Sequence, residues 1–351
     1  MPIIKSSLLL LIFSSLPLFA YSDSGASAID HAPIGVSADH YHKKGESMIS
    51  VRQGYMAMSG NSLNGSSIST SDILAMPNPL GDMPANLSVV PVEMDMKMTM
   101  IGAMYAPSDK VTLMAMAMYM SKDMDLNTYK PMMDRGLIGT FSTSSSDLSD
   151  LSLGAIIKLQ ETDLSRWHAE VTLQKSIGAN DSKGVVFTPM GMNMEMILPY
   201  GMQAGDDATR LLLGVTNVKT ISEKVLWGNQ LRGKFVVADD NWSFGDQLEF
   251  NTWLQYEVNK AVSLSSRMKF VDQDKISGSN PMISAPVQTA NPENYGGSEV
   301  HVGLGVNFLT HILPGKADRF GLELVKPIQQ DKNNLQMKTD YQLIFGYQKA
   351  F

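Results

Sequence analysis

The last residues of this chain alternate between two chemical types. Between residues 338 and 351, apolar or aromatic side chains such as Tyr341, Leu343 and Phe345 take every second place, and polar residues such as Gln342 lie between them. A period of two is typical of a β-strand, because successive side chains point to opposite faces of a sheet. Similar segments lie near residues 47–58, 94–105, 111–121, 150–160, 167–177, 207–218, 225–237, 246–258, 261–271, 298–309, 319–327 and 338–351. The sequence therefore predicts an all-β protein of about twelve strands.

The connections between these segments alternate in length. Short turns are expected near 106–110, 161–166, 219–224, 259–260 and 310–318, and long loops near 59–93, 122–149, 178–206 and 272–297, with shorter ones near 238–245 and 328–337. Transmembrane β-barrels have short turns at one end and longer loops at the other, whereas a soluble sandwich has no reason to sort its connections. We therefore predict a closed antiparallel transmembrane β-barrel with short periplasmic turns, long extracellular loops and both termini on the periplasmic side.

The composition excludes several other classes of protein. The chain has 351 residues, of which 44% are hydrophobic and 18% charged, and its mean hydropathy is −0.06. A helical membrane bundle is excluded because each spanning helix needs about 20 consecutive apolar residues. A net charge of −7 leaves no basic surface for nucleic acid. The absence of cysteine excludes thiolate metal sites, thiol nucleophiles and disulfides.

The N-terminal 20 residues have the pattern of a secretory signal peptide. Lys5 precedes an apolar run from Leu8 to Phe13, and a small residue, Ala20, closes the segment. A membrane anchor is the alternative, but Pro17 interrupts the run well short of a spanning length. We expect residues 1–20 to be removed, 21–46 to form a periplasmic segment or plug, and 47–351 to form the barrel.

A twelve-stranded barrel has a narrow lumen. Its size lies between roughly eight-stranded barrels filled by side chains and roughly sixteen-stranded porins with open channels. Placing the polar faces inward puts six basic and six acidic residues in the lumen, which predicts no strong charge selectivity: Lys158, Arg210, Arg232, Lys234, Arg267, Lys269, Glu170, Glu249, Glu257, Glu299, Glu323 and Asp340. Of these, Glu170, Arg232, Glu249, Arg267 and Glu299 are candidates for lining a solute path. Cross-strand ion pairing is the alternative role for each.

Methionine is the residue type in excess. Met recurs with period two from Met94 to Met100 and again from Met114 to Met120, and a third run lies between Met190 and Met196. The residues expected to line the lumen are Met98, Met100, Met104, Met114, Met116 and Met118. Three interpretations are open: Met fills space on a β-face, or lines a path for aromatic and aliphatic solutes, or binds soft Cu(I) or Ag(I) ions.

Histidine and aspartate are concentrated in the segment that precedes the first strand. His31, Asp39, His40 and His42 lie within twelve residues of one another. Imidazole nitrogens and carboxylate oxygens are ligands of divalent metals. The segment therefore has four candidate metal ligands, with hydrogen-bonded structure or a flexible tail as the alternative interpretation.

Several stretches resemble one family of membrane proteins. The residues are 31–46, the Met-alternating strand that runs into 102–109, the loop 198–203, and the closing 347–351. They are similar to proteobacterial outer-membrane β-barrel proteins described as transporters, which in turn are similar to the barrels of the meta-pathway phenol-degradation group. Ser37-Ala38 departs from the pattern, because Met-Gly is expected before Asp39.

The resemblance implies a place in the outer membrane of a Gram-negative bacterium. The implied partners are outer-membrane lipid, a small-molecule solute, and the barrel-assembly machinery, which would recognise the C-terminal strand ending at Phe351. No catalytic residue and no cofactor is implied.

The predicted function is passive passage of small, apolar or aromatic solutes through a narrow Met-lined lumen. One alternative is a Met-rich protein that binds or exports Cu(I) or Ag(I). A second is an outer-membrane lipid hydrolase, for which His168 and His301 are the in-strand histidines. If both histidines face the lumen, hydrolysis of lipid at the outer wall is excluded.

Overall fold

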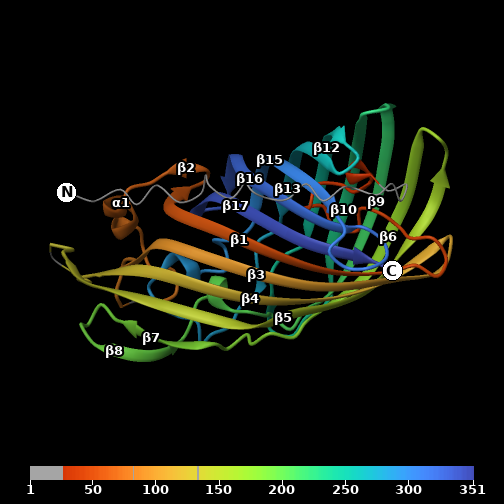
Figure 1. The fold of residues 1–351 in the computed structure, drawn as a ribbon. Helices are drawn as coiled ribbons and strands as arrows, with labels where there is room; N and C mark the ends of the chain where they lie inside the picture. The colour runs from red at the N-terminus through yellow and green to blue at the C-terminus, as the bar shows by residue number, and fades with distance from the viewer. Residues whose placement is uncertain (1–26, 82, 133) are drawn as a thin grey trace.

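The chain forms a closed barrel of twelve long antiparallel strands (Figure 1). A computed structural model describes residues 27–81, 83–132 and 134–351, so the expected signal peptide lies outside the described residues. Each strand pairs with the next along the chain, and the last strand pairs with the first. The barrel strands are β1 (Ser47–Leu63), β3 (Val89–Ser108), β4 (Val111–Tyr129), β5 (Leu137–Glu161), β6 (Ser165–Ser176), β9 (Thr209–Ser222), β10 (Val225–Ala238), β12 (Gln247–Asn259), β13 (Val262–Gln273), β15 (Gly297–Thr310), β16 (Asp318–Lys332) and β17 (Leu335–Ala350).

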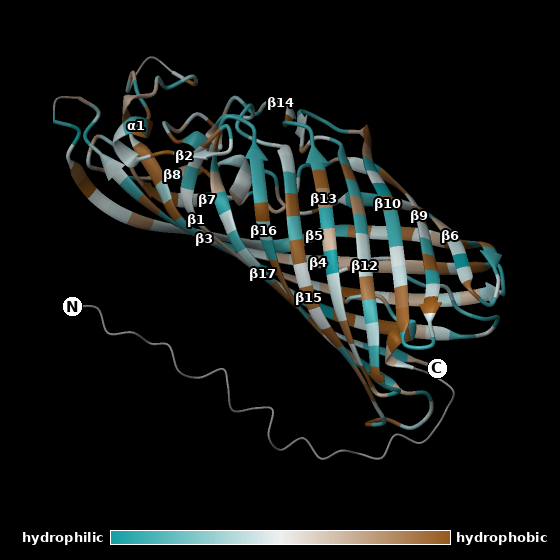
Figure 2. Ribbon diagram, turned by 90° about the horizontal axis from the view of Figure 1, so that it is seen from above, coloured by the Kyte–Doolittle hydropathy of each residue, from teal (hydrophilic) through white to brown (hydrophobic). Residues whose placement is uncertain are grey.

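The outer wall of the barrel is apolar. Figure 2 shows hydrophobic and hydrophilic bands alternating along the strands. Ile101, Leu113, Leu153 and Leu304 are exposed on the outside, while Thr112 and Ser152, next to Leu113 and Leu153, are buried. Hydrocarbon offers no water to unpaired amides, so a sheet that crosses a membrane must close on itself. The predicted fold class, a closed antiparallel barrel with outer-membrane architecture, is confirmed.

The two ends of the barrel differ. At one end, which we call the turn end, short connections join β3 to β4, β5 to β6, β9 to β10, β12 to β13 and β15 to β16. The other end, which we call the loop end, carries the remaining connections. Smaller elements are η1 (Ala28–Asp30), β2 (Ser66–Ser67), α1 (Thr70–Ala75), β7 (Lys183–Phe187), β8 (Asn193–Ile197), η2 (Tyr200–Met202), β11 (Trp242–Ser243), β14 (Ser277–Gly278) and η3 (Gln288–Ala290). No helix within the described residues is long and apolar enough to span a membrane.

Two predicted loops are largely strand. The segment 122–149 was expected to be a loop, but β4 continues to Tyr129 and β5 begins at Leu137. The alternation persists there with the polar face outward: Asp123 and Asp125 are exposed, while Met124 is buried. The 328–337 connection likewise shrinks to a tight turn between Lys332 and Leu335. Figure 1 shows β3, β4 and β5 reaching furthest at the loop end. The predicted bounds of these two loops were therefore wrong. The alternation of connection length still holds at 130–136, which is longer than the turns at 109–110 and 162–164, but it fails at the tight turn 333–334.

The long connections close over the loop end. Their apolar side chains form one buried cluster with the ends of β3, β4 and β17, which includes Tyr200, Met202, Trp242, Met94 and Met124. The Tyr200 and Trp242 rings meet edge to face, with centroids 4.7 Å apart. This packing covers the lumen at the loop end.

Candidate functional site

Residues 27–46, which we call the inner segment, lie inside the barrel. Their main-chain carbonyls accept hydrogen bonds from inward-facing side chains of the wall. The Ser37 carbonyl accepts from Gln230 at 2.8 Å, and the Ala38 carbonyl from Nε2 of His168 at 2.8 Å. Four more wall side chains donate in the same way: Arg52 to the Val36 carbonyl, Gln255 and Asn307 to the His31 carbonyl, and Arg319 to the Ala32 carbonyl. The hydrogen bonds from the wall to the inner segment therefore go mainly to its backbone.

Two glycines of the wall accommodate an apolar side chain of the inner segment. Ile34 is buried, and its side chain lies directly over Gly321 of β16 and Gly346 of β17. A Cβ atom on either glycine would overlap the Ile34 side chain. Small residues at these two places therefore make room for the inner segment.

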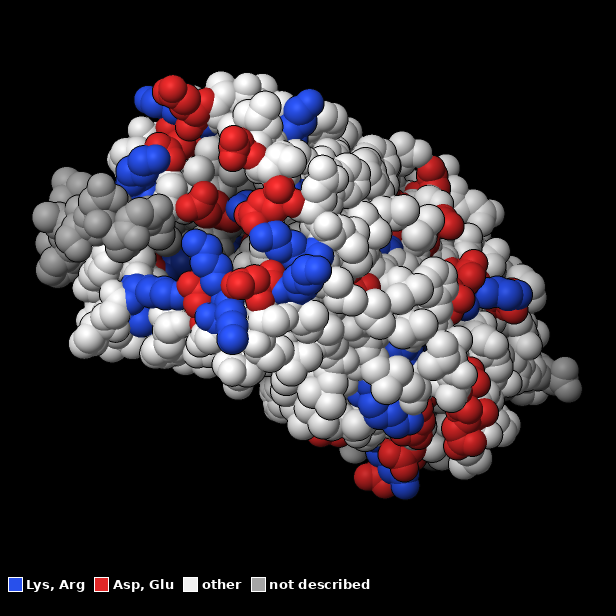
Figure 3. Space-filling view, turned by 90° about the vertical axis from the view of Figure 1, so that its right-hand side faces the viewer, with Lys and Arg blue, Asp and Glu red and all other residues white. Residues whose placement is uncertain are grey.

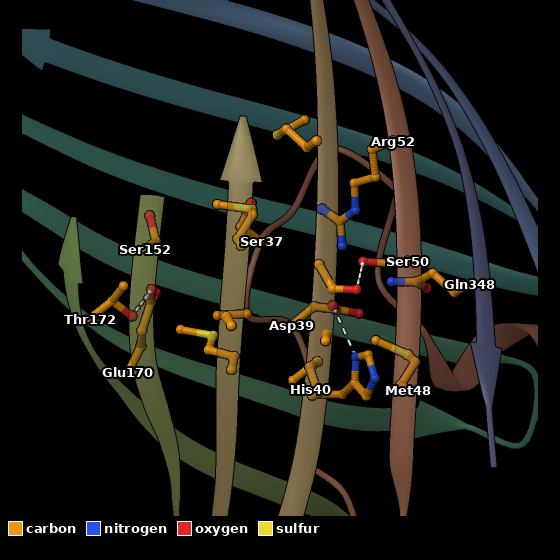
Figure 4. A pocket seen from close by; sticks show the side chains of 18 of the residues that line it. Ser37, Asp39, His40, Met48, Ser50, Arg52, Ser152, Glu170, Thr172 and Gln348 are labelled. Carbon is orange, nitrogen blue, oxygen red and sulfur yellow. Dashed lines mark hydrogen bonds and ion pairs between the residues drawn. The ribbon is translucent and has the colours of Figure 1, made fainter. Parts of the chain in front are cut away.

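A cavity of about 70 Å³ lies between the inner segment and the inward faces of β1, β3 and β4. Figure 4 shows the side chains that surround it, including Asp39 and His40 of the inner segment, Met48 and Arg52 of β1, and Glu170 of β6. Met48, Met100, Met104, Met114 and Met116 form its apolar wall; polar lining comes from Ser37, Asp39, His40, Ser50, Arg52, Ser152, Glu170, Thr172, Arg232 and Gln348. The cavity is thus apolar on one side and polar on the other.

Strand alternation places the methionines on the inside. On β4 the outward positions hold Leu113 and Tyr119, both exposed, and the intervening methionines point inward. The strands align methionines directly: Met104 lies opposite both Met48 and Met114, and Met100 lies opposite Met118. Of the six predicted residues, Met100, Met104, Met114 and Met116 line the cavity, whereas Met98 and Met118 share the same strand face without lining it.

Three lining residues of β1, Met48, Ser50 and Arg52, were not among the predicted ones. Met48 is buried and faces Met104, and Arg52 donates a hydrogen bond of 3.1 Å to the Val36 carbonyl. The period of two along β1 could have identified Met48 and Arg52 as lining residues, since they share a strand face. Applied to that strand, the argument used for β4 would have placed both of them inward.

The five charged residues predicted to line a solute path all lie in ion pairs. Arg232 contacts Glu170 at 2.8 Å, and this pair lines the cavity. Nε of Arg267 lies 2.7 Å from Oε1 of Glu323, and Oε2 of Glu249 lies 3.5 Å from Nζ of Lys269. Glu299 lies 3.4 Å from His301 and 3.8 Å from Lys332. The lumen therefore contains compensated charge, and Glu249, Arg267 and Glu299 lie outside the cavity.

The turn end of the barrel carries mixed charge. Figure 3 shows basic and acidic side chains gathered together on this end. A second hollow opens here beside the inner segment, lined by Lys43, Glu46, Asp109, Lys158, Glu161, Arg166 and Lys316 among others. Lys316 pairs with Glu46 at 2.6 Å, which ties the inner segment to the β15–β16 turn.

Three of the four predicted metal ligands meet. One ring nitrogen each from His31 and His40 and a carboxylate oxygen of Asp39 lie within 4.8 Å of one another. Burial raises the pKa of Asp39, but His40, followed by Arg319 and Arg52, outweighs this and holds that pKa well below its usual range. His42 is not part of the group, because its Nδ1 faces Glu46 at 3.6 Å and its amide donates to Thr112 of β4.

The two in-strand histidines both face the lumen. His168 is bonded to the Ala38 carbonyl inside the barrel, and His301 lies beside Glu299. Both side chains are buried, so neither reaches the lipid-facing surface. The geometry expected of a hydrolase acting at the outer wall is therefore not met.

Comparison with solved structures identifies the class of fold. No family model matches the chain, and no curated protein matches it. The COG4313 outer membrane channel from Pseudomonas putida F1 superposes with a TM-score of 0.55 at 13% identity, over 90% of this chain and 99% of that chain. This chain has the fold of an outer-membrane channel.

Other solved barrels are similar at lower scores. A TodX deltaS2S3 mutant monoaromatic hydrocarbon channel gives a TM-score of 0.45 at 11% identity, over 93% of this chain and 99% of that one. A Pseudomonas aeruginosa FadL homologue gives 0.39 at 8% identity, over 88% and 90%. At these identities the similarity concerns the fold, and the predicted kinship with the phenol-degradation group stays a prediction.

Proposed function

We propose that this chain is an outer-membrane channel through which small apolar or aromatic solutes pass by diffusion along a Met-lined lumen. The observation that carries the proposal is the cavity beside the inner segment, where Met100, Met104, Met114 and Met116 form one wall. Methionine side chains are flexible and polarizable, so they adapt to different apolar shapes and make favourable contacts with aromatic rings. Such a wall suits a class of apolar solutes better than one rigid ligand.

The apolar outer wall supports the membrane placement. Exposed Leu, Ile and Val side chains alternate with lumen residues along every barrel strand, as hydrocarbon requires. We place the turn end in the periplasm and the loop end outside the cell. In this orientation the inner segment lies at the periplasmic side of the lumen.

Passage requires one of the two closures to move. The buried loop cluster covers the loop end, and the inner segment occupies the lumen toward the turn end. Hydrogen bonds hold the inner segment, and each stabilises its docked position by about 1 kcal/mol net. The segment is connected covalently to the barrel at β1. We propose that its displacement opens the path.

Planar-bilayer recording and a vesicle influx assay with toluene and phenol test the proposal. The wild type is expected to show small, intermittent conductance and measurable solute influx. A triple variant without three wall donors, His168→Ala, Gln230→Ala and Asn307→Ala, is expected to raise conductance several-fold. Gln329→Ala, which removes an exposed amide at the loop end, is the matched control. A protein that inserts correctly but passes neither ions nor solute, even in the triple variant, would overturn the proposal.

The register of the methionines favours soft-metal binding as the second candidate. Met48, Met104 and Met114 lie side by side on three adjacent strands, and thioether sulfur is a soft ligand for Cu(I) and Ag(I). The double variant Met104→Leu/Met114→Leu separates the two functions, because leucine keeps the wall apolar but removes the sulfur. If the double variant keeps the phenol influx of the wild type, and the wild type binds no Ag(I), the result supports the solute channel. Ag(I) binding that this variant loses supports the metal function.

We further propose that the barrel-assembly machinery recognises the C-terminal strand. Strand β17 closes the barrel against β1, and the Phe351 amide donates to the Ser47 carbonyl at 2.8 Å. The Phe351 side chain is exposed at the turn end, where a partner can reach it. Deletion of Phe351 is expected to lower the amount of heat-modifiable barrel in outer membranes, and an unchanged amount would contradict this assignment.

A further inference from the structure

The cluster of His31, Asp39 and His40 lies where the inner segment folds back on itself inside the lumen. Their three ligand atoms lie within 4.8 Å of one another. The rings of His31 and His40 meet edge to face with centroids 4.9 Å apart, and Nδ1 of His40 lies 3.0 Å from Oδ1 of Asp39. Eight residues separate His31 from Asp39 along the chain, so the cluster joins the two ends of a loop.

Two ring nitrogens of this cluster lack a partner. Nδ1 of His31 and Nε2 of His40 are buried without a hydrogen bond, whereas Nδ1 of His40 faces Oδ1 of Asp39 at 3.0 Å as an ion pair. Buried polar atoms are nearly always satisfied, so each exception calls for an explanation. Three ligand atoms converging on one point, with two ring nitrogens unsatisfied, are explained by an ion bound between them.

The surroundings fix the ligands in place. The other carboxylate oxygen of Asp39, Oδ2, accepts a hydrogen bond of 3.1 Å from the Ala32 amide. Such contacts around a metal site orient the ligands. The carbonyls of His31 and Ala38, next to the cluster at either end, are held by Gln255 and His168 of the wall. The two ends of the loop are therefore held close together by the barrel.

We propose that His31, Asp39 and His40 bind one divalent transition-metal ion of the zinc class. Two imidazole nitrogens and one carboxylate oxygen suit such ions, whereas Mg²⁺ and Ca²⁺ prefer ligand sets made entirely of oxygen. The guanidinium groups of Arg52 and Arg319 lie near Asp39 and oppose a cation, so the affinity is weaker than that of a closed structural zinc site. The ion cross-links the loop of the inner segment and favours its docked position.

Co²⁺ absorption and Zn²⁺ calorimetry on the full-length barrel in detergent, stripped of metal with a chelator, test the proposal. One ion per chain is expected. His31→Gln, Asp39→Asn and His40→Gln should each weaken binding at least about tenfold, while His311→Gln, which removes a histidine outside the cluster, should bind as the wild type does. Circular dichroism and heat-modifiable migration establish that each variant is folded.

Two results would overturn the metal site. One is a wild-type barrel that binds neither Co²⁺ nor Zn²⁺, which decides the question even if a variant fails to fold. The other is binding that survives the loss of His31 and His40 or disappears with His311. Because binding is measured without transport, failure of the metal site leaves the channel proposal standing, and the reverse also holds.

Discussion

The main-chain amide of Gly35 donates a hydrogen bond of 2.8 Å to Oε2 of Glu323. The other oxygen of this carboxylate accepts from Nε of Arg267 at 2.7 Å. Glu323 on β16 thus joins the inner segment to a buried ion pair of the wall. The backbone can come this close because residue 35 has no side chain, since a Cβ there would overlap both Glu323 and Arg267.

Gly35→Ala is therefore expected to push the inner segment away from β16. Overpacking of this kind costs about 1–3 kcal/mol, and here it falls on the contact between the inner segment and wall side chains, so it weakens docking and leaves the strand pairing in place. The expected result is a wild-type amount of folded barrel with a higher single-channel open fraction in planar bilayers. Gly136→Ala is the control, because a Cβ there lies 3.6 Å from its nearest neighbour, Asp134. Equal open fractions for Gly35→Ala and the wild type would show that this contact does not hold the inner segment.

Ala38→Gly should have the opposite effect. Ala38 has φ of 51°, in the left-handed region that a residue with a Cβ enters at a cost of about 1–2 kcal/mol. Glycine avoids this cost but loses more entropy on docking, about 0.5–1 kcal/mol, which leaves a net gain of up to about 1 kcal/mol. Hydrogen exchange of residues 32–38 should slow by up to about fivefold. Faster exchange in the variant would contradict the left-handed conformation at this position.

Removing one partner of the buried pair should destabilise the barrel. Arg267 and Glu323 are almost fully buried, so Arg267→Met leaves a carboxylate without its guanidinium and should cost about 3 kcal/mol of unfolding free energy. Lys275→Met breaks the exposed pair with Glu293 and should cost less than about 1 kcal/mol. Urea unfolding in detergent measures both. Similar losses for the two variants would mean that the lumen solvates Glu323 freely.

A charge on the outer wall tests the membrane placement. The Leu153 side chain on β5 is 69% exposed on the lipid-facing surface, and Leu153→Arg should cost about 2–4 kcal/mol if the residue lies near the bilayer midplane. Met190→Arg, in the β7–β8 connection with 75% of its side chain exposed, should cost almost nothing. Reversible folding into lipid vesicles at different urea concentrations gives the comparison. If both substitutions have equal cost, Leu153 does not face hydrocarbon.

The strands could be predicted because the barrel imposes one rule on each of them. A strand with lipid on one side and the lumen on the other must alternate, and β4 shows this with Leu113 outside and Met114 inside. The rule was applied too narrowly beyond Met120, where outward aspartates were interpreted as a loop. There the strands carry polar residues outside and bury Met124 against the long connections.

The candidate site could be predicted only in part, because its geometry depends on contacts that a sequence does not record. Period two placed Met100, Met104, Met114 and Met116 on one face, but the cavity also needs the inner segment opposite them. The chain spacing of His31, Asp39, His40 and His42 made all four equal candidates. The fold distinguishes them: the His42 ring also packs against His40, with centroids 4.9 Å apart, but its Nδ1 faces Glu46 and its ligand atoms do not join those of the other three.

The wall of the lumen contacts the inner segment mainly through its carbonyl groups, which every amino acid has. Substitution along the inner segment is therefore restricted at few positions, such as Ile34 over its two wall glycines, Gly35 beside Glu323, and Ala38 with its left-handed backbone. Ala32 and Val36 are also restricted, because they pack against Val218 and Trp253 of the wall, whereas exposed residues such as Lys43 and Lys44 can change while the barrel keeps the same closure. The gate proposed above could therefore gain or lose ligands, such as the two histidines of the proposed metal site, without any alteration of the β-strands that hold it.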